Sequence, residues 1–381
     1  MSWDYLKAED YCDSVRDGTH DTPKPVESGY KLVTGKHIKN GTIDYSDAYF
    51  ISEKDYEAIN QRSLVEKWDV LMSMIGTVGE VAVVKETPNY AIKNVALFKC
   101  GGSELKGKWL KYYLSSPNAQ GKMRGGMKGS SQQFLSLKQL RELSIPVTTE
   151  HCMQKIVDTL SNYDNLIENN QKQIKLLEET AQRLYKEWFI DLHFPGYESA
   201  NIIDGVPDGW FKSPIGDLID KSYRSKQVKT ADYMIEGDIP VVDQSRAFIA
   251  GYTNDIETVV DIGKPVIVFG DHTRILKYIQ FPFAKGADGT QLIVSNCENM
   301  PQVLLYFSLL NVDLSNYHYA RHFKYLKAEE IIVPDKTMAE KYDDIATNNM
   351  KKVHVLREQI RNAEQARDRL LPKLMSGEIE V

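Results

Sequence analysis

Residues 163–179 read YDNLIENNQKQIKLLEE, and residues 342–358 read YDDIATNNMKKVHVLRE. The two stretches agree at seven positions when one is shifted by 179 residues, in the first copy Tyr163, Asp164, Asn169, Asn170, Lys172, Leu177 and Glu179. Each stretch follows a mixed globular segment. A repeat of this kind indicates a duplicated half, and a duplicated half predicts two related sites at a fixed separation.

Both stretches belong to longer patterns in which core positions recur on average every 3.5 residues. The first uses Ile156, Leu160, Tyr163, Ile167, Ile174, Leu177, Ala181, Leu184 and Trp188; the second uses Tyr342, Ala346, Asn349, Val353, Leu356, Ile360, Ala363, Arg367, Leu370 and Leu374. This period is typical of a coiled-coil seam. Asn170 and Asn349 occupy matching core positions, where a polar side chain fixes the register. The alternative is that each stripe packs only on its own globular domain, but the matched Asn residues favour two helices packed on each other.

The expected helices are about 40 residues long, which corresponds to roughly 60 Å. Strand-like runs closed by Pro146 and Pro334 precede them. The first helix is expected to stop before Phe194-Pro195-Gly196, and the second to be interrupted by Pro372 and stopped by Gly377. The predicted divisions are a first globular domain, a central spacer helix, a second globular domain and a C-terminal spacer helix, at residues 1–146, 147–192, 193–334 and 335–381.

The two globular segments show the same order of expected elements. In the first, strands are expected at Val70–Ile75, Glu80–Val84 and Asn94–Lys99, followed by a helix at Lys106–Leu114 and a glycine-rich loop over 121–133; in the second, strands are expected at Val266–Phe269, Tyr278–Phe281 and Gln291–Val294, followed by a helix at Gln302–Leu310. Asp13 matches Asp220, and Phe134 matches Phe323. The predicted fold class is therefore α+β, with two mixed α/β domains separated by two long helices that form an antiparallel coiled coil with pseudo-twofold symmetry.

Composition limits the class of protein. A chain of 381 residues with 42% hydrophobic residues suits two or three domains with real cores. It holds no apolar run of membrane-spanning length, the first residues do not read as a signal peptide, and the four cysteines lack CxxC spacing. We expect reduced thiols in a cytoplasmic protein. The net charge is −6, but residues 101–145 carry eight basic and two acidic side chains, and charge location matters more than the sum.

Catalytic motifs are poorly matched. The run Gly102–Lys108 has the spacing of a phosphate-binding loop, but Trp109 stands where a magnesium-binding Ser or Thr is required. His318 and His322 are four residues apart without the acidic neighbour of a zinc-protease helix, and Asp271-His272 has no identifiable nucleophile as partner. No methyltransferase signature is present. The sequence therefore predicts a chain without catalytic activity or a cofactor of its own.

Side chains suited to DNA are better supplied. Lys and Arg can contact phosphates or guanine, and Gln can pair bidentately with adenine. The candidates in the first half are Lys36, Lys122, Arg124, Lys128, Ser130, Ser131, Gln132 and Gln133; those in the second half are Arg224, Lys226, Gln244, Arg246, His272, Arg274, Arg321, His322 and Lys324. An ordinary surface role fits any single residue equally well, so this prediction rests on the clusters.

Several motifs together resemble the specificity subunits of Type I restriction-modification systems over essentially the whole chain. They are Gly76–Glu80, Tyr90–Leu97, Ser130–Leu140, Ser144–Pro146, Asp164–Gln171, Leu184–Phe189 and Ala366–Gly377, with weaker matches at Gly270–Arg274 and Gly286–Gln291. The resemblance implies two target-recognition domains that each read half of a split DNA sequence. It also implies that the helices act as a spacer and as a docking surface for two methyltransferase subunits, joined by two restriction subunits. S-adenosylmethionine, ATP and magnesium would serve those partners.

Two other interpretations remain open at the level of sequence. The chain could be a coiled-coil scaffold whose globular domains bind proteins, or a fused methyltransferase-nuclease, although the missing catalytic motifs speak against the second. Half-sites read from one side of a duplex lie about one helical turn, ~34 Å, apart. A rod of the predicted length spans that distance.

Overall fold

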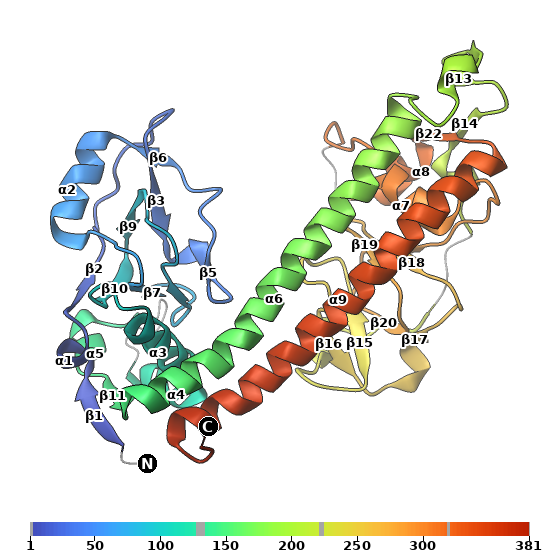
Figure 1. The fold of residues 1–381 in the computed structure, drawn as a ribbon. Helices are drawn as coiled ribbons and strands as arrows, with labels where there is room; N and C mark the ends of the chain where they lie inside the picture. The colour runs from blue at the N-terminus through green and yellow to red at the C-terminus, as the bar shows by residue number, and fades with distance from the viewer. Residues whose placement is uncertain (1–2, 127–133, 221–224, 318–320, 381) are drawn as a thin grey trace. The chain divides into compact units, whose positions relative to one another are not determined.

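The computed structural model describes residues 3–126, 134–220, 225–317 and 321–380. The chain divides into two compact units, which we call unit 1 (residues 1–167 and 361–381) and unit 2 (residues 168–360). The helices α6 (Glu150–Tyr185) and α9 (Lys336–Ser376) each contribute to both units (Figure 1). Among the described helices, none has both the length and the apolar character needed to cross a bilayer.

Unit 1 is built on three small sheets of strand order β1-β11, β2-β10-β7-β8 and β6-β3-β9, with a short β4-β5 hairpin (Figure 1). Its strands are β1 (Asp4–Lys7), β2 (Ser14–Asp17), β3 (Tyr30–Thr34), β4 (Ile38–Lys39), β5 (Thr42–Ile43), β6 (Phe50–Ile51), β7 (Val70–Ser73), β8 (Val81–Val83), β9 (Tyr90–Lys93), β10 (Val95–Lys99) and β11 (Ser144–Val147). Its shorter helices are α1 (Ala8–Tyr11), α2 (Glu53–Ser63), α3 (Glu104–Ser115), α4 (Pro117–Gly126) and α5 (Leu137–Arg141). Ser52, Ser103 and Ser136 cap three of these helices by accepting a backbone N–H in the first turn.

Unit 2 contains sheets of order β14-β22, β16-β15-β20-β17 and β19-β18-β21, with a β12-β13 hairpin. Its strands are β12 (Ile202–Ile203), β13 (Val206–Pro207), β14 (Phe211–Pro214), β15 (Ile239–Val242), β16 (Gly251–Thr253), β17 (Val259–Val260), β18 (Val266–Gly270), β19 (Leu276–Ile279), β20 (Phe283–Lys285), β21 (Thr290–Ile293) and β22 (Glu330–Val333). Its shorter helices are α7 (Gln302–Leu310) and α8 (Phe323–Ala328). The predicted helix at 302–310 is confirmed at both ends.

The two units repeat one plan, as the sequence predicts. In each, a strand near the start of the globular part pairs antiparallel with the strand that precedes a long helix, β1 with β11 and β14 with β22. Each unit also has a parallel pair, β3–β9 or β15–β20, and a central hairpin, β7–β8 or β18–β19. The matched residues Asp13 and Asp220 donate equivalent backbone hydrogen bonds, to the carbonyls of Lys99 and Val294, both at 2.9 Å.

The two long helices pair antiparallel. Within unit 2, the Tyr342 hydroxyl donates to the carbonyl of Ala181 at 3.0 Å, and Arg357 forms an ion pair with Glu178 at 2.7 Å. Further along, the Asn170 side-chain amide donates to Gln359 Oε1 at 3.0 Å. As residue numbers increase along α9, the numbers of their partners on α6 decrease. The predicted antiparallel packing of the two helices is confirmed, and Asn170, only 2% exposed, has the polar partner that a buried Asn requires.

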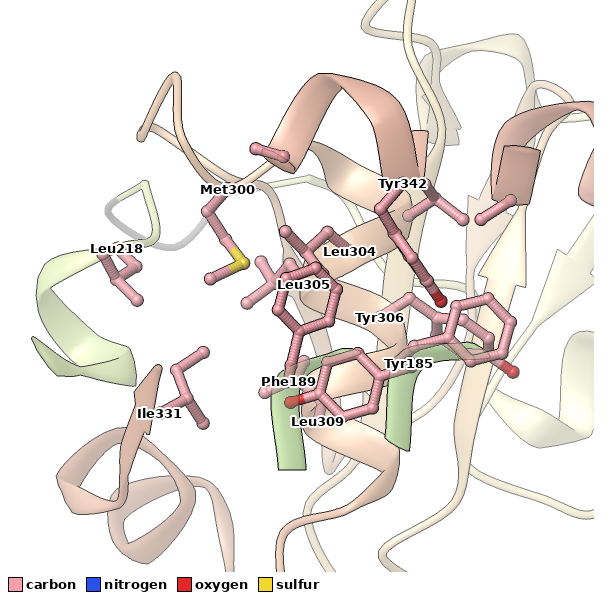
Figure 2. Packing of buried hydrophobic residues seen from close by; sticks show 14 of the residues in the cluster. Tyr185, Phe189, Leu218, Met300, Leu304, Leu305, Tyr306, Leu309, Ile331 and Tyr342 are labelled. Carbon is pink, nitrogen blue, oxygen red and sulfur yellow. The ribbon is translucent and has the colours of Figure 1, made fainter. Parts of the chain in front are cut away.

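The helix pair is continuous with the core of unit 2. Tyr185 at the end of α6 and Phe189 in the π-helical turn that follows it (Lys186–Ile190) meet Tyr342 from the start of α9, with Phe189 and Tyr342 ring centroids 5.3 Å apart in an edge-on arrangement. Apolar side chains of α7, including Leu305 and Leu309, lie against them (Figure 2). Aromatic pairs of this geometry add about 0.5–1.5 kcal/mol beyond their buried area. The end of the helix pair is therefore anchored in a domain core rather than standing alone.

In unit 1 the first half of α6 packs against the last part of α9 through a partly buried ionic cluster. Asp164 accepts hydrogen bonds from Lys111 at 2.7 Å, Tyr112 at 2.8 Å and Arg367 at 2.9 Å. Burial alone would raise the pKa of the Asp164 carboxyl, but the charge of Lys111 and these hydrogen bonds hold its pKa below the ordinary value. One carboxylate thereby joins α3, α6 and α9.

Three expectations about helices differ from the structure. Asn349 is only half-buried. The core residue that follows Ala346 is four positions along, not three, so Met350, at 0% exposure, lies in the core in its place. Helix α9 continues through Pro372 to Ser376 and ends before Gly377, whose φ is +74°. The described part of the expected glycine-rich loop, residues 121–126, is helical and belongs to α4.

Candidate nucleic-acid interface

In unit 1, three segments from distant parts of the sequence meet beside the central hairpin. They are the turn after β3 (Gly35–His37), the β7–β8 turn (Ile75–Gly79) and Phe134–Leu135, and we call them the three-loop surface of unit 1. A Cβ on Gly35 would lie 3.2 Å from Ser73 Cβ and 3.6 Å from the Ile75 carbonyl. The backbone of Leu135 donates to the Met74 carbonyl at 3.2 Å. The sheet topology therefore brings these three segments together.

Unit 2 has a three-loop surface at the same place in its topology. It consists of the turn after β15 (Asp243–Arg246), the β18–β19 turn (Gly270–Arg274) and Arg321–Phe323. The Thr273 hydroxyl donates to the Gln244 carbonyl at 2.7 Å, and the His272 backbone donates to Gln244 Oε1 at 3.1 Å. The Phe323 backbone donates to the Asp271 carboxylate at 2.7 Å. The correspondence predicted between Phe134 and Phe323 thus holds in space, because both lie against the central hairpin of their unit.

Close packing around Gln244 limits what this turn tolerates. Its side-chain amide donates to the Asp288 carbonyl at 2.8 Å. Gly289, with φ +85°, passes so near that an added Cβ would lie 2.6 Å from the His272 ring and 2.7 Å from the Gln244 amide nitrogen. Gln244 therefore uses its side chain to connect the β18–β19 turn with the turn before β21, while Arg246 beside it is exposed.

The exposed charges of the unit 2 surface are positive. The two carboxylates of its segments, Asp243 and Asp271, are 8% and 7% exposed and accept hydrogen bonds from neighbouring backbone N–H groups. The exposed basic side chains on the same segments and directly after them are His272, Arg246, Arg274, Arg321 and Lys324. A surface of this kind attracts phosphate, although the chain as a whole is acidic.

Arg274 is held in a defined position. Its Nε donates to His322 Nε2 at 3.3 Å, and its Nη2 donates to the Tyr317 carbonyl at 3.5 Å. Since an arginine Nε is always a donor, His322 Nε2 must be the acceptor and Nδ1 carries the proton. Burial and the neighbouring guanidinium lower the pKa of His322, which favours this neutral form. The end of the guanidinium remains available for a bidentate contact.

The unit 1 surface has different chemistry. Its β7–β8 turn is uncharged, and Ile75 and Phe134 are 37% and 41% exposed. Lys36 forms an ion pair with Asp47 at 3.0 Å. Exposed Lys122 and Arg124 lie on α4, and the packing of α4 on the turn is fixed by other residues of that helix.

Gln120 makes that packing contact. Its side chain donates to the carbonyls of Gly79 and Leu114, both at 2.8 Å, and so ties α4 to the β7–β8 turn. Sequence reasoning missed Gln120, because a lone Gln beside a glycine-rich run is indistinguishable from a solvated one. The placement of Lys122 and Arg124 near the turn depends on this contact.

The predicted DNA-contact residues are only partly brought together. Lys36 in unit 1, and Gln244, Arg246, His272, Arg274, Arg321 and His322 in unit 2, lie on the three-loop surfaces, with Lys324 adjacent. Lys226 instead forms ion pairs with Asp255 at 2.8 Å and Glu257 at 2.9 Å, at the short 3₁₀ helix (Ile256–Thr258) before β17. Outside the described residues are Lys128, Ser130, Ser131, Gln132, Gln133 and Arg224.

The weak catalytic motifs acquire structural explanations. Trp109, which spoils the phosphate-loop pattern, is fully buried and donates to the Pro146 carbonyl at 2.8 Å. His322 belongs to the Arg274 contact, and His318 lies outside the described residues. In the part of the chain that the structure describes, no group of three His, Cys, Asp or Glu side chains is arranged to hold a metal ion.

Comparisons with known proteins find specificity subunits of Type I restriction systems. Residues 24–179 match the family model described as the Type I restriction modification DNA specificity domain. The chain is 25% identical over 415 residues to the Type I restriction enzyme MjaIX specificity subunit of Methanocaldococcus jannaschii, covering 100% of this chain and 94% of that protein. It is 33% identical over 107 residues to the EcoR124I/EcoR124II specificity subunit of Escherichia coli, covering 28% of this chain and 26% of that one.

One solved structure has the same fold. The crystal structure of the S subunit of a Type I restriction-modification system from M. genitalium superimposes with a TM-score of 0.59 at 15% identity. The match covers 98% of this chain and 96% of that one. It thus includes both globular units and both long helices.

Proposed function

We propose that this chain, a relative of the specificity subunits of Type I restriction-modification systems, reads a bipartite DNA target, one half with each three-loop surface. Specificity subunits supply DNA sequence recognition within a complex and are not its catalytic subunits. The finer statement, that the target is split, rests on one observation. The same junction of three segments occurs twice, once in each unit, with different side chains exposed at it.

The difference between the surfaces supports two unlike half-sites. The unit 2 surface offers Arg246, Arg274 and Arg321, which suit phosphates and the acceptor-rich major-groove edge of guanine. The unit 1 surface offers exposed apolar side chains with Lys122 and Arg124 nearby, and apolar groups suit the methyl group of thymine. A shared scaffold with different exposed residues is what reading two different sequences requires.

The proposal assigns two roles to α6 and α9. As a continuous antiparallel pair that enters both units, they would set the number of unread base pairs between the half-sites. Their outer faces would dock two methyltransferase subunits, with two restriction subunits completing the complex on double-stranded DNA in the cytoplasm. S-adenosylmethionine, ATP and magnesium would be bound by those partners.

We expect Arg274→Ala to relax recognition at one base pair of the half-site read by unit 2. A bidentate arginine–guanine contact accounts for about 1–3 kcal/mol of discrimination, so selectivity at that position should fall by roughly fivefold to 150-fold. The assembled methyltransferase, tested on targets with single substitutions, provides the measurement. Alanine tolerates the Arg274 backbone, φ +60°, no worse than arginine does, so folding should be unaffected.

The controls for Arg274 separate base reading from charge. Arg274→Lys keeps the charge but cannot donate two parallel hydrogen bonds to one base, so we expect it to bind DNA with relaxed selectivity. Lys212→Ala removes an exposed cation on β14 and should leave selectivity unchanged. Unchanged selectivity in both Arg274 variants, with the unit 1 half-site equally unaffected, would remove Arg274 from the recognition surface.

Recognition by unit 2 should weaken in acid. Protonated His322 cannot accept from Arg274 and would place a second cation beside it, with His272 and the Asp271 carboxylate also nearby. The pKa of His322 in the folded protein lies below 6.5, so the unfolded chain binds the proton more readily and acidification from about pH 6.5 downwards also lowers stability. DNA binding by the complex between pH 7.5 and 5.5 tests this. His322→Asn keeps an acceptor that does not titrate, so it should flatten the profile; an unchanged profile would assign the acid effect to other groups.

The main alternative is a scaffold whose globular units bind proteins. Replacing residues 1–146 by the corresponding segment of another family member separates the two. If the units read DNA, the hybrid should methylate a target with one new and one original half-site. A hybrid that keeps the original target would overturn the assignment of unit 1.

A further inference from the structure

Lys277 is a buried lysine in the middle of strand β19. It pairs with Val268 of β18 across the hairpin and is 5% exposed. Its Nζ donates to the carbonyls of Asp243, at 2.7 Å, and Ala247, at 2.5 Å. The nearest Asp243 carboxylate oxygen is 3.9 Å away. The amine thus reaches from the hairpin to the two residues that flank Gln244–Arg246 in the turn after β15.

An ammonium group in this position is unfavourable unless its donors are satisfied. The neighbouring β-sheet residues Val242, Val268 and Ile279 form an apolar cluster. Burial lowers the pKa of Lys277 to about 8, against the opposing effect of the Asp243 carboxylate. Methionine would fill the same space without desolvating a charge. The two backbone carbonyls are therefore the specific reason that the structure offers for a lysine.

The two carbonyls that accept from Lys277 bracket the residues that present side chains to the three-loop surface of unit 2. Between them lie Gln244, Ser245 and Arg246. The near end is further fixed because Ser245 N donates to the Asp243 carboxylate at 2.9 Å and the Tyr233 hydroxyl donates to the same group at 3.3 Å. The far end, at Ala247, is held to β19 by Lys277.

We propose that Lys277 is a positioning residue that clamps the turn Asp243–Ala247 and so fixes Gln244 and Arg246 for recognition of the second half-site. It touches no DNA itself and acts through the turn. The inference rests on the proposed function, because it assigns this turn to base or phosphate contact. It adds a determinant of specificity that lies inside the sheet, where a search for exposed cations cannot find it.

The clamp is tested first without DNA. In the full-length chain, Lys277→Met should speed hydrogen exchange of the amides of residues 244–247 by about tenfold or more, since two internal hydrogen bonds are lost. Lys264→Met is the matched control: this exposed lysine also donates to a carbonyl of unit 2, Ser295 at 3.1 Å, but away from the turn. Lys277→Arg, which retains several donors, should restore protection in part. Equal protection in wild type and Lys277→Met would overturn the clamp and leave the proposed function untouched.

The second test asks whether the clamp serves recognition. In the assembled methyltransferase, Lys277→Met should reduce discrimination against substitutions in the unit 2 half-site, while discrimination in the unit 1 half-site stays at the wild-type value. The unit 1 half-site is an internal control for folding and assembly. Should the methionine variant fail to fold, Lys277→Gln replaces it in both tests, because its shorter side chain carries two uncharged N–H donors in place of the three of the ammonium. Faster exchange in the turn with wild-type discrimination would refute the positioning role, whereas a wild-type target without two half-sites would refute the proposed function itself.

Discussion

Replacing Asp164 by alanine is expected to destabilise unit 1 by about 3 kcal/mol, the lower end of the range for a buried ion pair, because the partly buried cations would lose their carboxylate. The side chains of Lys111 and Arg367, which both bind this carboxylate, are 13% and 24% exposed and have limited access to water. Hydrogen exchange of the full-length chain measures the effect for each unit separately. We expect protection in unit 1 to fall roughly a hundredfold or more, while unit 2 keeps its protection.

The internal repeat provides a matched control for Asp164. Asp343 is its counterpart in the second copy, but it accepts from the Thr347 hydroxyl at 3.0 Å, and burial raises the pKa of its carboxyl. Asp343→Ala should therefore change stability far less than Asp164→Ala. Equal effects at the two positions would mean that the ionic cluster contributes nothing beyond helix propensity.

Four residues inserted into both long helices should abolish methylation of the natural target and create a new one with a longer gap. Suitable positions are between Ile167 and Glu168 in α6 and between Ile360 and Arg361 in α9, where one unit ends and the other begins. Four helical residues add about 6 Å, which corresponds to just under two base pairs. Since neither three-loop surface is altered, both half-sites should keep their sequences.

Single-helix insertions are the control for this prediction. A four-residue insertion in α6 alone shifts its seam against α9 and misplaces contacts such as Asn170 with Gln359. We expect that variant to lose recognition without gaining a longer target. If the double insertion methylated the original spacing, the helices would not be the element that sets the gap.

The general fold was predictable from sequence because it depends on periodicity and repetition. The 3.5-residue seam predicted paired helices, and the shift between the copies predicted two units of the same plan. Asn349 was misplaced because a heptad allows a step of three or four, and the one-residue difference between Asn349 and Met350 is decided by packing against α6. The heptad pattern of one helix alone therefore cannot decide whether residue 349 or residue 350 faces α6.

Buried polar residues explain a second kind of error. The strand expected at Tyr278–Phe281 is found at Leu276–Ile279. Lys277 reads as a solvated residue before a strand, but in the structure it lies within the strand and is buried. The same property that obscured the strand makes Lys277 informative, since a lysine in a sheet interior requires specific acceptors.

The candidate site was predictable in content but not in arrangement. Arg274, His322 and Gln244 were recognisable as polar residues in a basic and aromatic context. Their contacts join residues separated by 28 to 48 positions, and such pairings depend on the topology of the sheet. Gln120 carries no sequence signal, because its role is a contact with a turn 41 residues away.

The most direct test of a two-part DNA reader is to map methylated bases across the genome of the host with and without this gene. The account predicts that one set of methylated sites disappears with the gene. Those sites should share two short specific sequences separated by a constant number of unspecified base pairs, about one helical turn between centres. Loss of a continuous motif, or no change in methylation, would contradict it.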